Sequence, residues 1–278
     1  MELTVLMDDN ILHNTYLRAE HGLSYLLESR KNKILFDAGY SELFLYNADK
    51  LNKEITDIDH LILSHGHLDH SWGLEALSRR FVEKKIGGED FKKPNLIAHP
   101  HFAIPKHYQG AQIGIHLSDG FLESIFDFGL SAEPKWIEDD LLFLGDIPRR
   151  FDFEKGSPIG SIETEQGLED DHISDDTAVV YTGGENGIVV ITGCSHSGIC
   201  NIVEQAKELS GRGDIHAVIG GFHLQDPGQE RLDKTAEYML KNEVDLIYPA
   251  HCTDLKSKIA LAQKLNVKEV GVGLKLDF

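Results

Sequence analysis

The stretch Leu61-Ile-Leu-Ser-His65-Gly-His67-Leu-Asp69-His70 decides how the rest of the chain is interpreted. Its first four residues are apolar or small and indicate a buried strand. Three histidines and one aspartate follow, and Gly66 lets the turn tighten so that His65 and His67 can point at one centre. Imidazole with carboxylate is the ligand set of Zn, Mn and Fe, whereas Ca and Mg prefer oxygen alone. The stretch predicts a metal site at a strand end, because a solvated His-rich loop would not need such tight spacing.

Strands and helices alternate on both sides of this stretch, and a polar turn at 29–32 joins two of the strands. The segment from about 84 to 176 is less regular and holds most of the prolines. Because no linker or low-complexity segment interrupts the pattern, we expect one domain over 1–278 with an irregular insertion at about 84–176. Strands are expected at 2–7, 23–28, 33–37, 59–64, 96–99, 141–144, 177–181, 187–192, 216–220, 244–248 and 269–273, and helices at 41–51, 71–77, 199–209, 231–241 and 255–265.

Composition restricts the possible partners. The formal charge of −19 over 278 residues argues against a nucleic-acid or anionic-membrane surface, because both are polyanions. No stretch approaches the roughly 20 apolar residues that a membrane helix needs, and the N-terminus does not resemble a signal peptide. The three cysteines, Cys194, Cys200 and Cys252, are odd in number and form no C-x-x-C pair. We therefore expect a cytoplasmic protein without a disulfide scaffold, and the sequence leaves its oligomeric state open.

The H-x-H-x-D-H motif after a strand resembles the signature of the metallo-β-lactamase superfamily. Further segments, spread over nearly the whole chain, resemble one subgroup, the archaeal and bacterial proteins named as dihydropterin-ribofuranosylaminobenzene-phosphate synthases. Leu68, Asp146 and Asp254 depart from that subgroup, which commonly has Tyr, Glu and Gly there; these changes touch the pocket more than the metal. The matching segments are Asp8-Asp-Asn10, Glu20-His-Gly-Leu-Ser-Tyr25, Ile34-Leu-Phe-Asp-Ala-Gly39, Gly145-Asp-Ile-Pro-Arg149, Thr192-Gly-Cys-Ser-His-Ser-Gly198, Gly220-Gly-Phe-His-Leu224 and His251-Cys-Thr253.

The resemblance implies an α/β fold, the αββα sandwich in which two facing mixed β-sheets are flanked by helices. It also implies that Asp37, at the end of a strand, is a buried group that orients the metal-binding loop. Many members of the subgroup carry their name by similarity only. Fold and metal site therefore transfer to this chain better than the substrate does.

Two metal positions are expected. We assign His65, His67 and His196 to the first, and Asp69, His70 and His251 to the second. A lone histidine after a strand is more often structural, but the H-x-H-x-D-H context favours ligand roles for His196 and His251. Two divalent ions are expected, zinc first, with manganese or iron as alternatives.

The ligand that bridges the two metals is left open. Cys194 lies two positions before His196, so both would face one side of an extended backbone, and a thiolate suits zinc. An ordinary buried thiol is an equal alternative. Asp146 precedes His196 in the chain, which is the wrong order for the bridging aspartate of many relatives.

Substrate contacts are expected from Glu20, His21, Asp176 and His223. The segment 20–24 distinguishes the subgroup outside its metal motif, and His21 could instead be bonded internally. His223 could ligate a metal, although a substrate role is favoured. The acidic run 169–176 is expected to be a solvated loop. Lys106, Arg149 and Arg150 are candidate anion contacts, with surface solubility as the default.

The expected activity is metal-assisted chemistry on a small molecule, with Asp69 and His223 as catalytic residues. An activated water would hydrolyse an ester, thioester, amide, lactone or phosphoester. A pterin-type condensation would instead use the metals on a phosphate or a leaving diphosphate. A redox di-iron enzyme is disfavoured, because such relatives have a glutamate in place of His67. A non-catalytic metal-binding or sensor protein would usually have lost a motif histidine.

Overall fold

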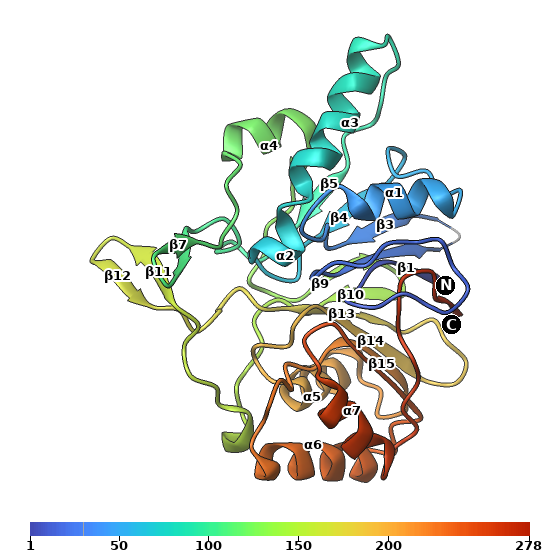
Figure 1. Cartoon of the computed structure of the whole chain (residues 1–278), viewed down its shortest axis with the longest axis vertical. Coiled ribbons are helices and arrows are strands. Elements are labelled where there is room, and N and C mark those ends of the chain that lie inside the picture. Colours follow the sequence, from blue (N-terminus) through green and yellow to red (C-terminus); the bar gives the residue numbers. More distant parts are fainter. Residues whose placement is uncertain (30) are drawn as a thin grey trace. The chain divides into compact units, whose positions relative to one another are not determined.

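The structure is a computed structural model that describes residues 1–29 and 31–278 (Figure 1). Its contacts divide the chain into two units, each with its own mixed sheet and its own helices. The predicted turn at 29–32 is closed by a hydrogen bond from the Ser29 amide to the Asn32 carbonyl, and position 30 lies outside the described residues. Unit 1 comprises Met1–Ser131, Pro158–Asp171 and Gly271–Asp277, and unit 2 comprises Ala132–Ser157, His172–Val270 and Phe278.

The main sheet of unit 1 has seven strands in the order β17-β1-β2-β3-β4-β5-β8. Strands β1 to β3 are antiparallel, whereas β3, β4, β5 and β8 run parallel. Parallel strands bring their carboxyl ends to one edge, so the residues after β3 and β4 lie together. The strands are β1 (Glu2–Met7), β2 (Ser24–Glu28), β3 (Lys33–Phe36), β4 (His60–Ile62), β5 (Asn95–Ile97), β8 (Asp127–Phe128) and β17 (Lys275–Asp277).

Helices cover one face of this sheet. In Figure 1, α1 and α3 lie on the same side of it. Their buried residues recur at helical spacing, as Leu74, Leu77 and Phe81 do in α3, and they join a core with Leu35 and Leu61 of the strands. The helices of unit 1 are α1 (Leu43–Lys50), α2 (Leu68–Ser71), α3 (Leu74–Ile86) and α4 (Asp119–Ile125).

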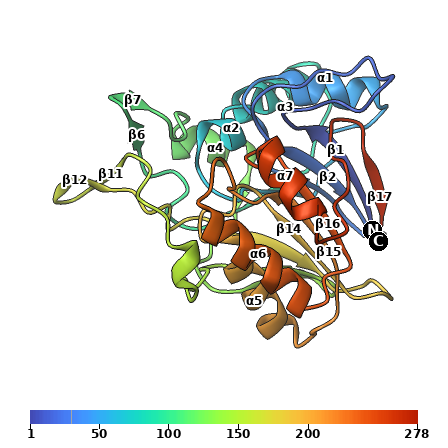
Figure 2. The same ribbon diagram turned by 60° about the horizontal axis from the view of Figure 1, so that its bottom comes forward.

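A second, four-stranded sheet of unit 1 has the order β12-β11-β6-β7 and lies away from the seven-stranded sheet in both ribbon views (Figures 1 and 2). Lys106 in this sheet is fully buried, and its Nζ lies 3.4 Å from an oxygen of Asp171. The default expectation of a surface lysine is therefore wrong. The strands are β6 (Lys106–Tyr108), β7 (Ala111–Gln112), β11 (Ser161–Thr164) and β12 (Gly167–Asp170).

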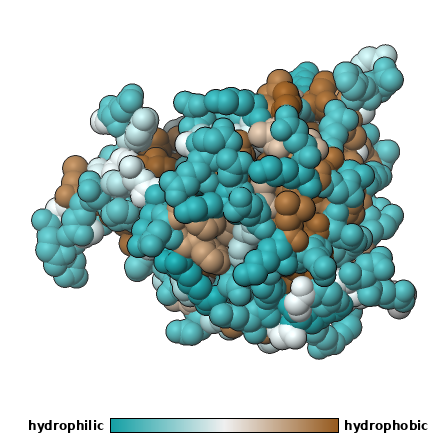
Figure 3. Space-filling view, turned by 90° about the horizontal axis from the view of Figure 1, so that it is seen from below, coloured by the Kyte–Doolittle hydropathy of each residue, from teal (hydrophilic) through white to brown (hydrophobic). Residues whose placement is uncertain are grey.

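Unit 2 has a six-stranded sheet in the order β16-β15-β14-β13-β10-β9, in which β14, β15 and β16 run parallel. Helices α5, α6 and α7 lie along one face of this sheet (Figure 2) and share its core. Seen from the side of α6, the surface is covered mainly by hydrophilic residues (Figure 3). The elements are β9 (Lys135–Glu138), β10 (Leu141–Phe143), η1 (Asp152–Glu154), β13 (Ala178–Tyr181), β14 (Ile188–Thr192), α5 (Ile199–Ser210), β15 (Ile215–Gly221), α6 (Gln229–Lys241), β16 (Leu246–Ala250) and α7 (Leu255–Ala262).

The predicted α/β class, with mixed sheets that carry helices, is confirmed. The strand expected at 269–273 is wrong: Val272 makes only an isolated bridge with Ile11, and the last strand is β17. The single-domain boundary over 1–278 stays a prediction. Among the described residues, no helix is long and apolar enough to cross a membrane.

Candidate metal centre

Unit 1 gathers four of the predicted ligand side chains at the carboxyl end of β4. His65, His67, Asp69 and His70 are all buried. The Nε2 of His65 lies 3.1 Å from the Nδ1 of His67. Two imidazole nitrogens on one tetrahedral zinc ion, with bonds of about 2.0–2.1 Å, would be about 3.3 Å apart. The spacing and the donor types of this pair therefore fit a shared metal.

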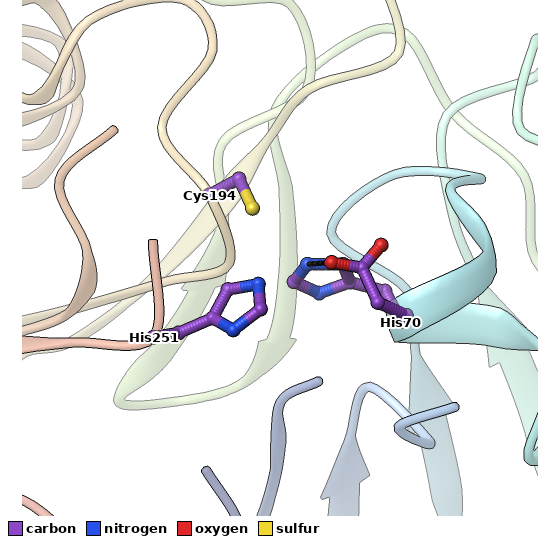
Figure 4. A group of neighbouring side chains, drawn as sticks. His70, Cys194 and His251 are labelled. Atoms are coloured by element: carbon purple, nitrogen blue, oxygen red, sulfur yellow. Dashed lines mark ion pairs between the residues drawn. The ribbon is translucent and has the colours of Figure 1, made fainter. Parts of the chain in front are cut away.

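Asp37 supports the cluster formed by His65, His67, Asp69 and His70 through hydrogen bonds. It follows β3, is fully buried, and accepts hydrogen bonds from the Ser64 amide, the Ser64 hydroxyl and the Nδ1 of His70, each at 2.7 Å. The other ring nitrogen of His70, Nε2, lies 3.7 Å from Asp69 Oδ2; the dashed line in Figure 4 marks this ion pair. A carboxylate behind a ligating histidine fixes its tautomer and ring orientation. This contact agrees with the role predicted for Asp37.

His21 extends the cluster outward through a chain of three side chains. Its Nε2 lies 3.2 Å from the Oδ2 of Asp69, and its Nδ1 lies 3.1 Å from the Oδ2 of Asp9. The Gly22 backbone runs against the carbonyl of Asp69, where an added Cβ would lie only 2.8 Å away. The expectation that 20–24 lies beside the metal ligands thus has a structural counterpart within unit 1.

Glu20 is used differently from its neighbour. Its oxygens accept hydrogen bonds from the amide and hydroxyl of Ser41, at 2.8 to 2.9 Å. These bonds anchor segment 20–24 to the start of α1. The substrate role of Glu20 stays a prediction.

In unit 2, the loops after three parallel strands carry the predicted functional residues. His196 follows β14, His223 follows β15 and His251 follows β16. Ser195, His223 and His251 all have positive φ, between 44° and 60°, which is uncommon for residues other than glycine. Strained backbone of this kind persists where the surrounding structure over-determines it, often at functional sites.

Hydrogen bonds link these strand ends to one another. The Ser195 hydroxyl donates to the Gly221 carbonyl at 2.6 Å, and the Gly221 amide donates to the Gly193 carbonyl at 2.7 Å. The Phe222 amide donates to the hydroxyl of Thr253 at 3.0 Å. The three loops therefore form one connected support.

Cys194 lies within this group. Its sulfur and a ring nitrogen of His251 lie within 4.8 Å of each other, as do its sulfur and a ring nitrogen of His196. Figure 4 shows the Cys194 thiol on the side of the His251 ring. All three residues are buried, so the thiol is placed where it can join the histidines as a metal ligand.

Cys252 is also buried and lies close to these side chains. Burial raises the pKa of its thiol, but hydrogen bonds with Cys194 and His223, together with the charges of His251 and His223, outweigh burial and hold that pKa well below its ordinary value. The His223 ring centre lies 4.5 Å from that of His196. The sequence analysis does not single out Cys252 beyond its place in the segment 251–253.

Asp176 supports the His196 loop. Its Oδ2 accepts a hydrogen bond from the Ser197 amide at 2.8 Å, while its buried Oδ1 has no hydrogen-bond partner among the described residues. Burial raises the pKa of this carboxyl to about 6, against the hydrogen bonds of the loop. The expected solvated loop at 169–176 is wrong, because Glu169 and Asp170 end strand β12 and Asp171, Asp175 and Asp176 are buried.

The candidate anion contacts of unit 2 are engaged within that unit. The Arg149 guanidinium donates to the carbonyls of His172 and Ile173, and Arg150 pairs with Glu208. These bonds give both arginines a structural use. Any role in holding a substrate phosphate stays a prediction.

Comparison with known proteins places the chain in a family. Residues 17–251 match the family model described as the metallo-beta-lactamase superfamily, and the chain belongs to that superfamily. An uncharacterised protein of Methanocaldococcus jannaschii is 32% identical over 94% of each chain. A second protein of that organism, named 7,8-dihydropterin-6-methyl-4-(beta-D-ribofuranosyl)-aminobenzene-5'-phosphate synthase, is 32% identical over 93% of this chain and 89% of its own. A solved structure described as a metal-dependent hydrolase of the β-lactamase superfamily has a TM-score of 0.83 at 25% identity, covering 100% of this chain and 99% of that one.

The comparisons confirm the resemblance to the superfamily and to its synthase-named subgroup. The structure brings the predicted residues of each unit together within that unit, and the ligand roles stay predictions. Sequence reasoning missed Asp9, although it lies in the segment 8–10 that supported the resemblance. Cys194 was weighed as a ligand but left open.

Proposed function

We propose that the chain is a metal-dependent enzyme that binds two divalent metal ions and acts on a small-molecule substrate. The observation that carries this proposal is the cluster of four buried donors after β4, oriented by the Asp37 carboxylate. Zinc is the favoured ion, with manganese or iron as alternatives, because imidazole and carboxylate donors suit all three. The proposed ligands are His65, His67 and His196 for one ion and Asp69, His70 and His251 for the other, with Cys194 as an added candidate.

Such ions act as Lewis acids on carbonyl or phosphoryl oxygens and favour the ionised form of water. Asp69 orients the attacking group and holds a proton on its carboxylate during the reaction. His21, 3.2 Å from Asp69, keeps that carboxylate in place, and Asp9 fixes the ring of His21 from its other side. In unit 2, His223 and Asp176 contact the substrate.

Two reactions are candidates for this site. Hydrolysis of an ester, thioester, lactone or phosphoester is supported by the similar structure described as a metal-dependent hydrolase. A condensation that releases phosphate or diphosphate is supported by the synthase-named relative. Both would use the same donors, so the substrate decides between them.

Metal content is the first test. Protein purified without chelator should contain about two metal ions per chain by elemental analysis. Chelation should remove them, and Zn or Mn should restore them. A metal content near zero that neither ion restores would disprove the proposal.

Activity is the second test. Phosphodiesterase, thioesterase, lactonase and lactamase substrates, and a condensation assay for the product in the relative's name, should be compared with and without chelator. We expect one of these activities to depend on metal. If a metal-loaded protein shows none of them, the protein is better described as a metal-binding protein than as an enzyme of these classes.

A further inference from the structure

Two large aromatic side chains meet at the surface of unit 1, immediately beside the predicted metal ligands. The rings of Tyr40 and Trp72 are stacked, with centroids 5.5 Å apart and planes inclined by 21°. Tyr40 is 42% exposed. Neither residue was assigned a role from the sequence, and neither belongs to the donor cluster.

The backbone fixes the two rings relative to the donors. Trp72 follows α2, which carries Asp69 and His70. The Ala38 amide donates to the His70 carbonyl at 2.8 Å, and the Gly73 amide donates to the Gly39 carbonyl at 3.1 Å. A Cβ on Gly73 would lie 1.9 Å from the Ala38 carbonyl oxygen, so only glycine permits this approach. The segments 38–40 and 70–73 are therefore tied together through their backbones.

The same contacts place Tyr40 next to the outer end of the donor cluster. A Cβ on Gly22 would lie 3.1 Å from the Tyr40 amide nitrogen and 2.8 Å from the Asp69 carbonyl oxygen. Gly22 directly follows His21, whose ring contacts the Asp69 carboxylate. A molecule that rests on Tyr40 would thus have its other end within reach of Asp69.

The contacts of Trp72 within the unit account for its position, whereas those of Tyr40 leave part of its ring exposed. The Trp72 indole donates its N–H to the Gly114 carbonyl at 2.8 Å, and its ring packs against that of His116 in a T-shaped contact. Tyr40 has less support: its ring stacks on Trp72, and its hydroxyl makes no hydrogen bond with the described residues. A ring that stacks on a partly buried neighbour and keeps 42% of its surface exposed can stack on another flat ring.

We propose that the outer face of Tyr40, backed by Trp72, is a shelf on which a planar aromatic or heteroaromatic ring of the substrate stacks while its reacting bond lies at Asp69. This inference rests on the proposed function for the reaction, but the shelf itself consists of unit 1 residues and needs no metal. It gives the substrate a class: a compound with a flat ring system joined to the group that reacts.

Binding can be measured at the shelf directly, because the chain has only two tryptophans, Trp72 and Trp136. In ¹⁵N-labelled full-length Trp136→Phe protein, the single indole N–H signal reports Trp72. We would titrate this protein with 2-naphthoate and with decahydro-2-naphthoate, which share the charge and carbon skeleton but differ in ring planarity. The Trp72 signal should shift saturably with 2-naphthoate. The dissociation constant for 2-naphthoate should be lower than that for decahydro-2-naphthoate.

Variants locate the effect. Tyr40→Leu should weaken 2-naphthoate binding by about 2- to 10-fold, the range expected for one ring stack, whereas Tyr40→Phe should retain it. Tyr108→Leu is the matched control, because Tyr108 lies in the same unit and is 47% exposed. It should leave binding unchanged.

The outcomes separate this inference from the proposed function. Equal binding of the two compounds, no binding of 2-naphthoate, or equal losses in Tyr40→Leu and Tyr108→Leu would each overturn the shelf, even in a protein with full metal content. Ring-selective binding that Tyr40→Leu weakens would support it, even if elemental analysis found no metal and the proposed function failed.

Discussion

The donors of unit 1 and the donors of unit 2 are held by different means. In unit 1 they are adjacent in sequence, and one buried carboxylate, Asp37, accepts hydrogen bonds from Ser64 and His70 beneath them. In unit 2 each donor comes from a different strand end, and hydrogen bonds among the loops hold the backbone. Removal of one side chain should therefore disrupt the site residues of unit 1. In unit 2, the site residues should instead be displaced when an added Cβ crowds the backbone of the strand ends.

The largest effect is expected at Asp69, which belongs to the predicted ligands of unit 1 and is also the proposed proton carrier. Asp69→Asn should keep the fold and much of the metal but lower kcat by about 10²- to 10⁴-fold, the usual contribution of a general acid–base group. Asp9→Asn, at the outer end of the same chain of side chains, should cost much less. Steady-state kinetics on the substrate that is found would measure both. Near-normal turnover of Asp69→Asn would show that its assigned role is wrong.

The next effect tests the single support of unit 1. Asp37→Asn cannot accept all three hydrogen bonds, which leaves buried donors unpaired and the His70 ring free to turn. We expect a loss of about 3–5 kcal/mol in the free energy of unfolding and a loss of about 10- to 100-fold in metal affinity. Chemical denaturation and competition with a metal indicator would measure them.

Asp57→Asn is a suitable control for that experiment, because Asp57 is an exposed carboxylate of the same unit that pairs with Lys33. It should change the free energy of unfolding by no more than about 1 kcal/mol. Equal effects of the two substitutions would mean that Asp37 is not the main support of the cluster.

The same contrast explains what the sequence could predict. A strand followed by closely spaced donors is local information, so the segment 61–70 indicated metal ligands without any structure. His196, His223 and His251 are far apart in the chain, and although the sequence predicted a strand before each, only the fold showed that these strands are parallel neighbours. The pairing of Lys106 with Asp171 and the stack of Tyr40 on Trp72 join segments with no shared pattern. Only tertiary structure could show them.

The corresponding test for unit 2 is a substitution that crowds the backbone at a strand end. Gly221→Ala would place a Cβ 2.5 Å from the Cys252 sulfur and 2.7 Å from the Gly193 carbonyl oxygen. Overpacking of this kind costs about 1–3 kcal/mol, and the loop carrying Cys252 and His251 should shift with it. Gly213→Ala is the matched control, since nothing lies within 4 Å of an added Cβ there. Thermal unfolding and metal affinity should separate the two variants, and indistinguishable results would mean that the strand ends of unit 2 yield easily.

The smallest effect concerns the pH dependence of stability at Glu154, which bonds the start of α5, two residues beyond the turn that carries His196. Its carboxylate accepts the amides of Cys200 and Asn201 at 2.8 and 2.9 Å, and burial raises the pKa of this group against those bonds. An acid whose pKa is raised by folding takes up protons more readily in the folded state. Its protonation therefore stabilises the fold at low pH, and this contribution is lost as pH rises through the folded pKa.

The prediction concerns the difference in the free energy of unfolding between the unsubstituted protein and Glu154→Gln. This difference should increase as pH falls from about 7.5 to 4.5, by about 1.4 kcal/mol for each unit by which folding raises the pKa. Glu230→Gln should show no such increase, because the hydrogen bond with Lys234 lowers the pKa of Glu230. Urea unfolding at several pH values measures the difference, and a flat or opposite trend for Glu154 would show that the amides of α5, rather than burial, dominate this carboxyl.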